Sequence, residues 1–404
     1  MNTPQLTLST RRYDLDWLRV LAFALLIFYH TGMFFVEWEW HIKNNMISKA
    51  LEWPMMFASQ WRMSLLFIIS GAATFFILEK LPTGPFMWER TKRLFFPLVF
   101  GMFVIIPPQI YFERLYKGST YSYAEFYPDV LNMVPFPEGS FSWHHLWYIC
   151  YIFVYSLVFL PLLLWLRSES GKKVTTRIGR LFTVPVLLYG LALFQFVIEI
   201  SLKDAWEPKN NLIQDWYNHG IYGGFFLIGF LLCTQNACWQ AVENQRKWSL
   251  GLGLLTVTVL YAFYWIGWKD LTGTDLVVYR LIKSFNRWFW LLTLLGFAKR
   301  YLSFNSPALQ YANQAVYPFY ILHQTVIICI AYPLINLAWG VAPKFALIVV
   351  LTFASCWILF EGLIKHWNVT RFLFGLKPLL AKQNALNYQP DVAKTDEVTI
   401  GLNN

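Results

Sequence analysis

The stretch YDLDWLRVLAFALLIFYH, residues 13–30, decides what kind of fold this chain adopts. Its apolar run is about as long as a helix needs to cross a bilayer, yet it contains Arg19 and His30. Ionisable residues inside a membrane helix are unfavourable unless they have a partner or a function. The stretch therefore predicts a transmembrane helix that carries polar groups for a reason. We expect this helix to be retained, because Phe34 and Phe35 follow it where a signal peptide would have a small-residue cleavage site.

The composition of the whole chain is typical of a membrane protein. Of its 404 residues, 57% are hydrophobic and only 14% are charged, whereas a soluble domain carries about a quarter charged residues. The net charge of +10 would suggest nucleic acid in a soluble protein, but here Lys and Arg fall between apolar runs. We therefore expect a lipid bilayer as the solvent, no nucleic-acid partner, and anionic ligands for some of the basic residues.

Ten segments are long and apolar enough to be predicted as transmembrane helices. They are residues 15–36, 55–79, 94–112, 145–166, 181–201, 217–235, 249–267, 276–298, 308–335 and 344–364. The chain is thus predicted to be an all-α, polytopic membrane helix bundle, with residues 1–378 as one transmembrane domain and 379–404 as a disordered cytoplasmic tail. If the N-terminus is cytoplasmic, most of the 33 Lys and Arg residues lie inside, which predicts that both termini are cytoplasmic. The eighth segment carries Arg280, Lys283 and Arg287, so its first half is expected in the interface or a wet cavity.

Arg19 and His30 are predicted to share one face of the first helix. They are eleven residues apart, which is three turns plus about 20° and a rise of roughly 16 Å. In a hydrocarbon core about 30 Å thick, Arg19 then lies near the cytoplasmic boundary and His30 beyond the midplane. Each alone has an ordinary explanation, because Arg19 can reach headgroups or pair with Asp16, and His30 can be a hydrogen-bonded bundle histidine. Together they indicate a polar connection from the inner surface into the membrane.

Other polar groups in apolar segments are weighed in the same way. Arg90 and Arg93 are one helical turn apart at the inner end of the third segment, where they can bind phosphate or simply follow the positive-inside rule. His145 and Tyr148 begin the fourth segment and can line an outer pocket or anchor the helix at the interface. Glu361 in the last segment is expected to be a buried carboxyl group.

The ninth segment and the outer loops complete the polar inventory. Pro318 is expected to loosen the helix and free carbonyl groups, beside Tyr317, Tyr320, His323 and Gln324. Ser70-Gly71 indicates close helix packing. Residues 37–54 and 113–144 are rich in aromatic and polar side chains, a pattern that suits an interfacial aromatic belt and also suits sugar binding.

In this order, these residues resemble acyltransferase family 3, a family of integral membrane proteins. The matching motifs are Arg, ten residues and His at Arg19–His30, Arg-x-x-Arg at Arg90 and Arg93, FIISG (67–71), HHLWYI (144–149), YPFYILHQ (317–324) and LFGLKP (373–378). The match covers roughly residues 11–378. WEWHIKNN (38–45) is most similar to the glucan biosynthesis protein C branch, which is linked to succinylation of periplasmic glucans.

The resemblance implies transfer of an acyl group, acetyl or succinyl, from cytoplasmic acyl-CoA to a hydroxyl of an extracytoplasmic glycan or lipid-linked sugar. It implies a multi-pass protein of the bacterial inner membrane. Acyl-CoA is then a co-substrate, and we expect no permanently bound cofactor and no metal. The oligomeric state stays open.

The resemblance also implies roles for the polar residues already singled out. Arg19, Arg90 and Arg93 would hold the CoA phosphates, and His30 would act as general base or accept the acyl group itself. The remaining catalytic candidates, His145, His323 and Tyr320, would orient the acceptor or donate to the oxyanion. A transporter or flippase is the alternative, because buried histidines and a Pro-broken helix also suit transport. A scaffold protein would explain the membrane-buried polar residues less well.

Overall fold

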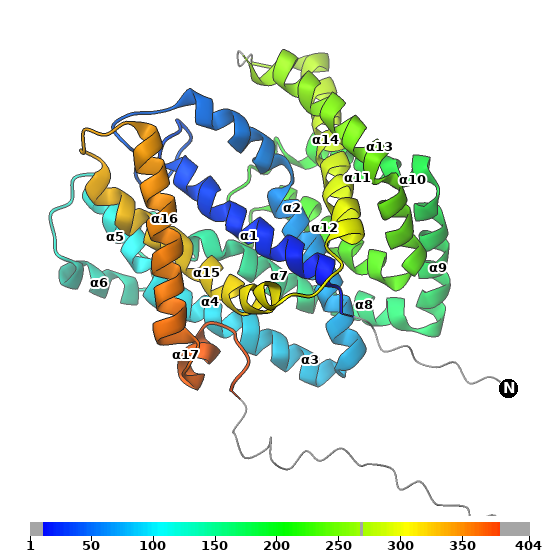
Figure 1. The fold of residues 1–404 in the computed structure, drawn as a ribbon, viewed down its shortest axis with the longest axis horizontal. Helices are drawn as coiled ribbons and strands as arrows, with labels where there is room; N and C mark the ends of the chain where they lie inside the picture. Colours follow the sequence, from blue (N-terminus) through cyan, green and yellow to red (C-terminus); the bar gives the residue numbers. More distant parts are fainter. Residues whose placement is uncertain (1–10, 267–269, 380–404) are drawn as a thin grey trace, which may run out of the picture.

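The computed structural model describes residues 11–266 and 270–379, and all regular structure within them is helical (Figure 1). Seven helices are long and apolar enough to cross a membrane. They are α1 (Tyr13–Met33), α2 (Lys49–Lys80), and the runs Thr83–Tyr116, Pro185–Leu202, Asn236–Trp265, Pro307–Leu334 and Val341–Ile364. His144–Val158 and Leu160–Arg167 make an eighth span if they count as one helix bent by 53°. The described residues thus agree with the prediction of an all-α membrane bundle.

The runs are assembled from shorter helical pieces. Thr83–Tyr116 contains α3 (Thr83–Arg90), the π-helix η1 (Thr91–Phe95), α4 (Phe96–Phe100), the π-helix η2 (Gly101–Ile105) and α5 (Pro107–Tyr116). The bent pair contains the 3-10 helix η3 (His144–Leu146), α7 (Trp147–Val158) and α8 (Leu160–Arg167), and Pro185–Leu202 contains α10 (Pro185–Gly190) and α11 (Ala192–Leu202). The later runs are α13 (Asn236–Leu260) with η4 (Tyr261–Trp265), α15 (Pro307–Ala331) with η5 (Tyr332–Leu334), and α16 (Val341–Leu359) with η6 (Phe360–Ile364). The shorter helices are α6 (Tyr123–Leu131), α9 (Glu169–Thr183) and α17 (Asn368–Leu373).

Two of the ten predicted spans are helices outside the group of seven or eight. Segment 217–235 is α12 (Trp216–Thr234), and segment 276–298 is α14 (Gly273–Tyr301). The number of ten spans and the cytoplasmic position of both termini therefore stay predictions. Of the predicted tail, residues 380–404 lie outside the described residues.

Three basic residues in the first half of α14 are buried, and two of them have acidic partners. Lys283 pairs with Glu199, which is fully buried on α11, and Arg280 pairs with Asp204 just after α11. Arg287 is 8% exposed. Because a buried cation is tolerated when it is paired and hydrogen-bonded, these contacts explain how α14 keeps Arg280 and Lys283 inside the bundle. The sequence pattern pointed to an interface or wet cavity, since it cannot reveal a carboxylate supplied by a distant helix.

Helices α2 and α12 approach each other closely through glycine. A Cβ atom added at Gly71 would lie 1.8 Å from the main-chain oxygen of Phe226, and one added at Gly229 would lie 2.0 Å from that of Ile68. Each helix thus presents a glycine to the backbone of the other, as the Ser70-Gly71 motif predicts.

Helix α1 lies inside the bundle and orients the site. It contacts α2, α14, α15 and α16, and Figure 1 shows it crossing the middle of the molecule. Leu18, Phe23 and Leu26 on α1 are buried. Helix α15 continues through Pro318 without interruption, so the expected loosening does not break it. The unbroken α15 packs against α1.

Candidate active site

Arg19 and His30 both face α15. Arg19 Nη2 donates to Asn313 Oδ1 at 2.7 Å and lies 3.2 Å from Asp16 Oδ1. His30 Nδ1 lies 2.8 Å from His323 Nε2. The two residues therefore share the stripe of α1 predicted from their spacing, and one helix supplies partners to both.

The hydrogen bonds around His323 determine where the protons of two neutral imidazoles lie. His323 Nδ1 is 2.6 Å from the main-chain oxygen of Tyr320, which can only accept, so Nδ1 carries the proton. His323 Nε2 is then an acceptor, and His30 Nδ1 must donate to it. His30 Nε2 is left without a proton, as a general base requires.

The donor groups of the other predicted catalytic residues are engaged. His145 Nε2 donates to Ile321 O at 3.0 Å, so His145 Nδ1 accepts from Gln109 Nε2 at 3.2 Å. Tyr320 Oη donates to His145 O at 2.5 Å. His323 Nδ1–H is engaged by Tyr320 O. His145, His323 and Tyr320 therefore have no side-chain proton free to donate to an oxyanion. These contacts fix the orientation of the three side chains, and their predicted roles in orienting the acceptor or donating to the oxyanion stay predictions.

A second hydrogen-bond chain runs outward from His145. Gln324 Nε2 donates to Gln109 Oε1 at 3.0 Å and lies 3.0 Å from His41 Nε2. His41 Nδ1 in turn lies 2.5 Å from Glu113 Oε2. Gln109 and Glu113 are buried on α5, and sequence reasoning missed both, because two polar residues near the end of an apolar run look like an ordinary interface.

A cavity of about 1200 Å³ opens over these groups. Its wall includes four histidines (His30, His41, His144 and His145), aromatic side chains (Trp40, Trp143, Trp147, Tyr217 and Tyr222) and amides (Asn210, Asn211, Gln214, Asn218 and Gln324). Aromatic faces and amide groups together suit a polyhydroxylated ligand, which can stack and form hydrogen bonds. Tyr148, predicted to line an outer pocket with His145 or to anchor the helix at the interface, hydrogen-bonds Ser70 Oγ at 2.6 Å.

Arg62 is a functional candidate that sequence reasoning missed. It lines the same cavity, and its guanidinium carbon lies 3.4 Å from the centre of the Tyr29 ring, next to His30 in sequence. Its Nε and Nη1 atoms are buried and have no hydrogen-bond partner among the described residues. The signal was available, because Arg62 is a charged residue inside a predicted span, the same criterion that selected Arg19.

The segment between α1 and α2 is tied down over the cavity by Lys43. Its ammonium donates to the main-chain oxygens of Met33 and Val36, both at 2.8 Å, and to that of Trp38. Burial lowers the pKa of Lys43 to about 8. This anchoring holds Trp40 at the cavity wall.

A smaller, basic cavity of about 230 Å³ lies at the other end of the α1 stripe. Its charged lining residues are Arg11, Arg12, Arg19, Lys80 and Asp16. Arg19 Nε is buried without a hydrogen-bond partner among the described residues. The excess of cations makes this cavity suitable for an anionic group.

The structure does not combine Arg90 and Arg93 into one fork. Arg90 is 9% exposed and hydrogen-bonds Thr74 Oγ1, with its buried Nε unpartnered among the described residues. Arg93 Nε lies 2.6 Å from Glu89 Oε1. A spacing of one turn places Arg90 and Arg93 on one side of the helix. Thr74 on α2 is a partner for Arg90 only.

Phe23, Tyr148 and Tyr320 form an aromatic cluster, in which only Tyr320 lines the large cavity. Phe23 follows Arg19 by one turn, and its ring centre is 4.9 Å from that of Tyr320 and 6.0 Å from that of Tyr148. The residues lining one cavity do not line the other. Phe23 and Tyr148 line neither cavity, so the two cavities have separate walls.

Glu361 is not the buried carboxyl group that its place in an apolar segment predicts. Its side chain is 28% exposed, and it lies 2.9 Å from Lys365 and 2.7 Å from Tyr311 Oη. It lies on η6 at the end of the last span, where a charged side chain can reach water and pair with Lys365 one turn later.

Known proteins are similar to this chain over most of its length. The model of the family described as "Acyltransferase domain" matches residues 12–361. Similar curated proteins include "Glucans biosynthesis protein C" of Escherichia coli (strain K12 / DH10B), 22% identical over 93% of this chain and 97% of the relative. The protein of that name from Shigella dysenteriae serotype 1 (strain Sd197) is 23% identical over the same shares. No solved structure matches the chain. Because the family model spans most of the sequence, including Arg19 and His30, the chain belongs to acyltransferase family 3.

Proposed function

We propose that this protein is a multi-pass O-acyltransferase of the bacterial inner membrane. It moves an acyl group, acetyl or succinyl, from cytoplasmic acyl-CoA to a hydroxyl of an extracytoplasmic glycan or lipid-linked sugar. The observation that carries this proposal is the contact of His30 Nδ1 with His323 Nε2 beside a cavity of aromatic and amide groups, because it leaves His30 Nε2 as the acceptor in the neutral ring. The names of the glucan biosynthesis relatives support a glucan acceptor.

In the direct route, His30 acts as general base. The acceptor hydroxyl attacks the thioester carbonyl, a C–O bond forms, and His30 Nε2 takes the hydroxyl proton. The C–S bond then breaks, and the proton passes from His30 Nε2 to the leaving sulfur. His323 accepts from His30 Nδ1–H throughout and so keeps Nε2 directed at the reacting groups.

Arg62 is the group best suited to hold the oxyanion. It carries a fixed positive charge, and two of its buried nitrogens have no partner among the described residues. Donors prepared in advance for a developing negative charge are usually the largest single contribution to acyl transfer. His145, His323 and Tyr320 then act by positioning, since their own protons are engaged.

The basic cavity supports an anionic donor on the opposite side. Arg19 lines it together with Arg11 and Arg12, and phosphate groups favour guanidinium partners. Arg90 and Arg93 supply two further positive charges, near the start of the helical run from α3 to α5. In this proposal, the donor's long arm reaches from the basic cavity to His30.

The proposal is tested with purified protein in detergent, acyl-CoA and a glucan acceptor, by measuring the release of free thiol and the acylated glucan. A transporter needs no such chemistry, so release of thiol that depends on His30 supports the acyltransferase over the transporter. A stoichiometric burst of thiol from acyl-CoA alone would indicate an acyl-His30 intermediate. Absence of transfer with acetyl-CoA and with succinyl-CoA would contradict the proposed donors.

A further inference from the structure

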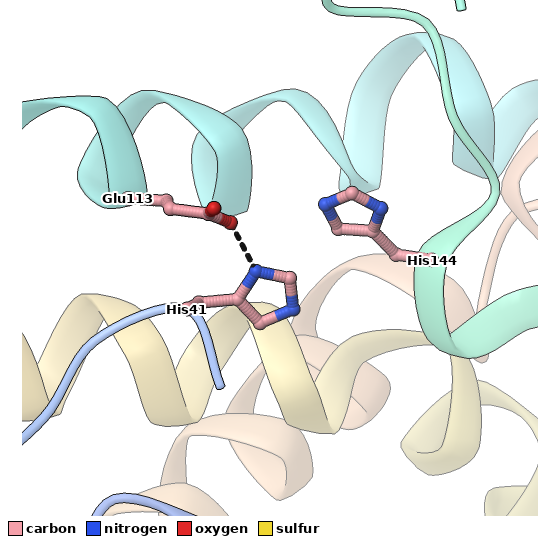
Figure 2. A group of neighbouring side chains, drawn as sticks. All are labelled: His41, Glu113 and His144. Atoms are coloured by element: carbon pink, nitrogen blue, oxygen red, sulfur yellow. Dashed lines mark hydrogen bonds and ion pairs between the residues drawn. The ribbon is translucent and has the colours of Figure 1, made fainter. Parts of the chain in front are cut away.

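Three potential metal ligands meet at the rim of the large cavity, away from His30. His41 comes from the segment between α1 and α2, Glu113 from α5, and His144 from η3 (Figure 2). One ligand atom from each residue lies within 4.8 Å of the other two, and no other such group occurs among the described residues. His41 and His144 line the cavity, so the cluster has an open side.

The atoms that could bind an ion are directed at one another. His41 Nδ1 lies 2.5 Å from Glu113 Oε2. His144 Nε2 is buried and has no hydrogen-bond partner among the described residues, and in Figure 2 the ring of His144 presents a nitrogen to the other two side chains. The two imidazole centres are 4.7 Å apart, with the ring planes inclined by 24°. A buried ring nitrogen facing a carboxylate–imidazole pair lacks one partner, and a cation would supply it.

The outer contacts of the cluster also suit an ion. His144 Nδ1 lies 2.7 Å from Ser142 Oγ, which leaves Nε2 for the ion. Lys117 lies 2.6 Å from Glu113 Oε1, which leaves Oε2. Metal-bound histidines usually engage their second ring nitrogen in a hydrogen bond, and metal-bound carboxylates are themselves hydrogen-bonded.

We propose, in contrast to the expectation of no metal from the family resemblance, that His41 Nδ1, Glu113 Oε2 and His144 Nε2 bind a divalent transition-metal ion. Two imidazoles and one carboxylate favour Zn²⁺, with a fourth position open to the cavity. For this, the proton on His41 Nδ1 moves to Nε2, and Gln324 turns its amide oxygen toward it. The ion joins three chain segments at the rim and presents a binding position for a hydroxyl of the ligand.

The test uses the full-length protein in detergent, with any polyhistidine tag removed. It is stripped with EDTA, dialysed, and titrated with ZnCl₂ and with CoCl₂. Bound zinc is measured by mass spectrometry, and Co²⁺ by the visible absorption of a four-coordinate site. We expect about one tight Zn²⁺ per chain, and at least a 10-fold weaker affinity in Glu113→Gln and in His144→Asn. The control His366→Asn changes an exposed histidine and should bind like the parent.

Two outcomes would overturn the metal site. One is that the parent protein binds no more Zn²⁺ than His144→Asn. The other is that His366→Asn loses as much Zn²⁺ affinity as the ligand variants. If the ligand variants aggregate, Ser142→Ala gives the answer, because it removes only the partner of His144 Nδ1 and should weaken binding about 10-fold. Unchanged affinity in Ser142→Ala would then count against the site. These measurements need no acyl transfer, so they are independent of the proposed function.

Discussion

His30 and His323 stack across the interface between α1 and α15. Their ring centres are 5.0 Å apart, the planes are inclined by 13°, and Nδ1 of His30 lies 2.8 Å from Nε2 of His323. Because His323 is itself held by the main chain of Tyr320, this contact selects the tautomer of His30. In the proposed mechanism, this contact directs His30 Nε2 as the base.

His30→Ala should lower the transfer rate by about 100- to 10,000-fold, because it removes the general base. Thiol release from acyl-CoA in the presence of glucan measures this rate. His366→Ala, at an exposed site, is the matched control and should retain full activity. Near-parental activity of His30→Ala would exclude His30 from the mechanism.

His323→Leu should lower kcat by about 100-fold, because His30 then loses the acceptor that orients it. His323→Gln should retain more activity than His323→Leu, since a glutamine oxygen can still accept from His30 Nδ1–H. The difference in activity between the two variants distinguishes loss of the hydrogen bond to His30 from loss of side-chain packing. Equal activities in the two variants would contradict the tautomer assignment.

Arg62→Gln should lower kcat by about 100- to 1,000-fold with little change in KM for the glucan, because it removes an oxyanion donor. Steady-state kinetics over a range of glucan concentrations measure both quantities. Arg300→Gln, at an exposed arginine, should be unaffected. A rise in KM alone would instead assign Arg62 to ground-state binding of the acceptor.

Arg19→Gln and Arg93→Gln should each raise KM for acyl-CoA by about 10-fold or more, because each removes a charge-assisted hydrogen bond to phosphate. The effect should shrink as salt is added, since salt screens the parent's interaction. Lys172→Gln changes an exposed lysine and serves as the control. An unchanged dependence on acyl-CoA would leave these arginines as topology signals only.

Gly71→Ala should destabilise the bundle by about 1–3 kcal/mol or more, because its Cβ would overlap the main chain of Phe226 on α12. Gly251→Ala is the matched control, since a Cβ there has no atom within 4 Å. Thermal unfolding in detergent compares the two variants. Equal midpoints would show that α2 and α12 can separate without loss of stability.

Several features of the fold and site could be predicted from the sequence because they depend on local periodicity. The spacing of Arg19 and His30 alone places them on one face of a helix, and the structure confirms that both face α15. Ser70-Gly71 predicted a close approach, which occurs against α12. Long apolar runs predicted helices, because backbone polar groups in lipid must be satisfied within the segment.

Other features required partners that are distant in the sequence. Nothing local indicates that Glu199 pairs with Lys283, or that Arg90 is buried on Thr74 while Arg93 is not. Arg62 could have been selected as a charge inside a span, but its place beside His30 depends on how α2 packs on α1.

The sequence by itself determined that the chain is a bundle of membrane helices with a cation and an imidazole on one stripe, because helical periodicity and hydropathy are properties of neighbouring residues. Only the tertiary structure decided which nitrogen of His30 is free, since Tyr320 and His323 lie almost three hundred residues away. It also brought together His41, Glu113 and His144 from three segments. Proton positions and ligand clusters depend on contacts between elements, and no periodicity within one element encodes them.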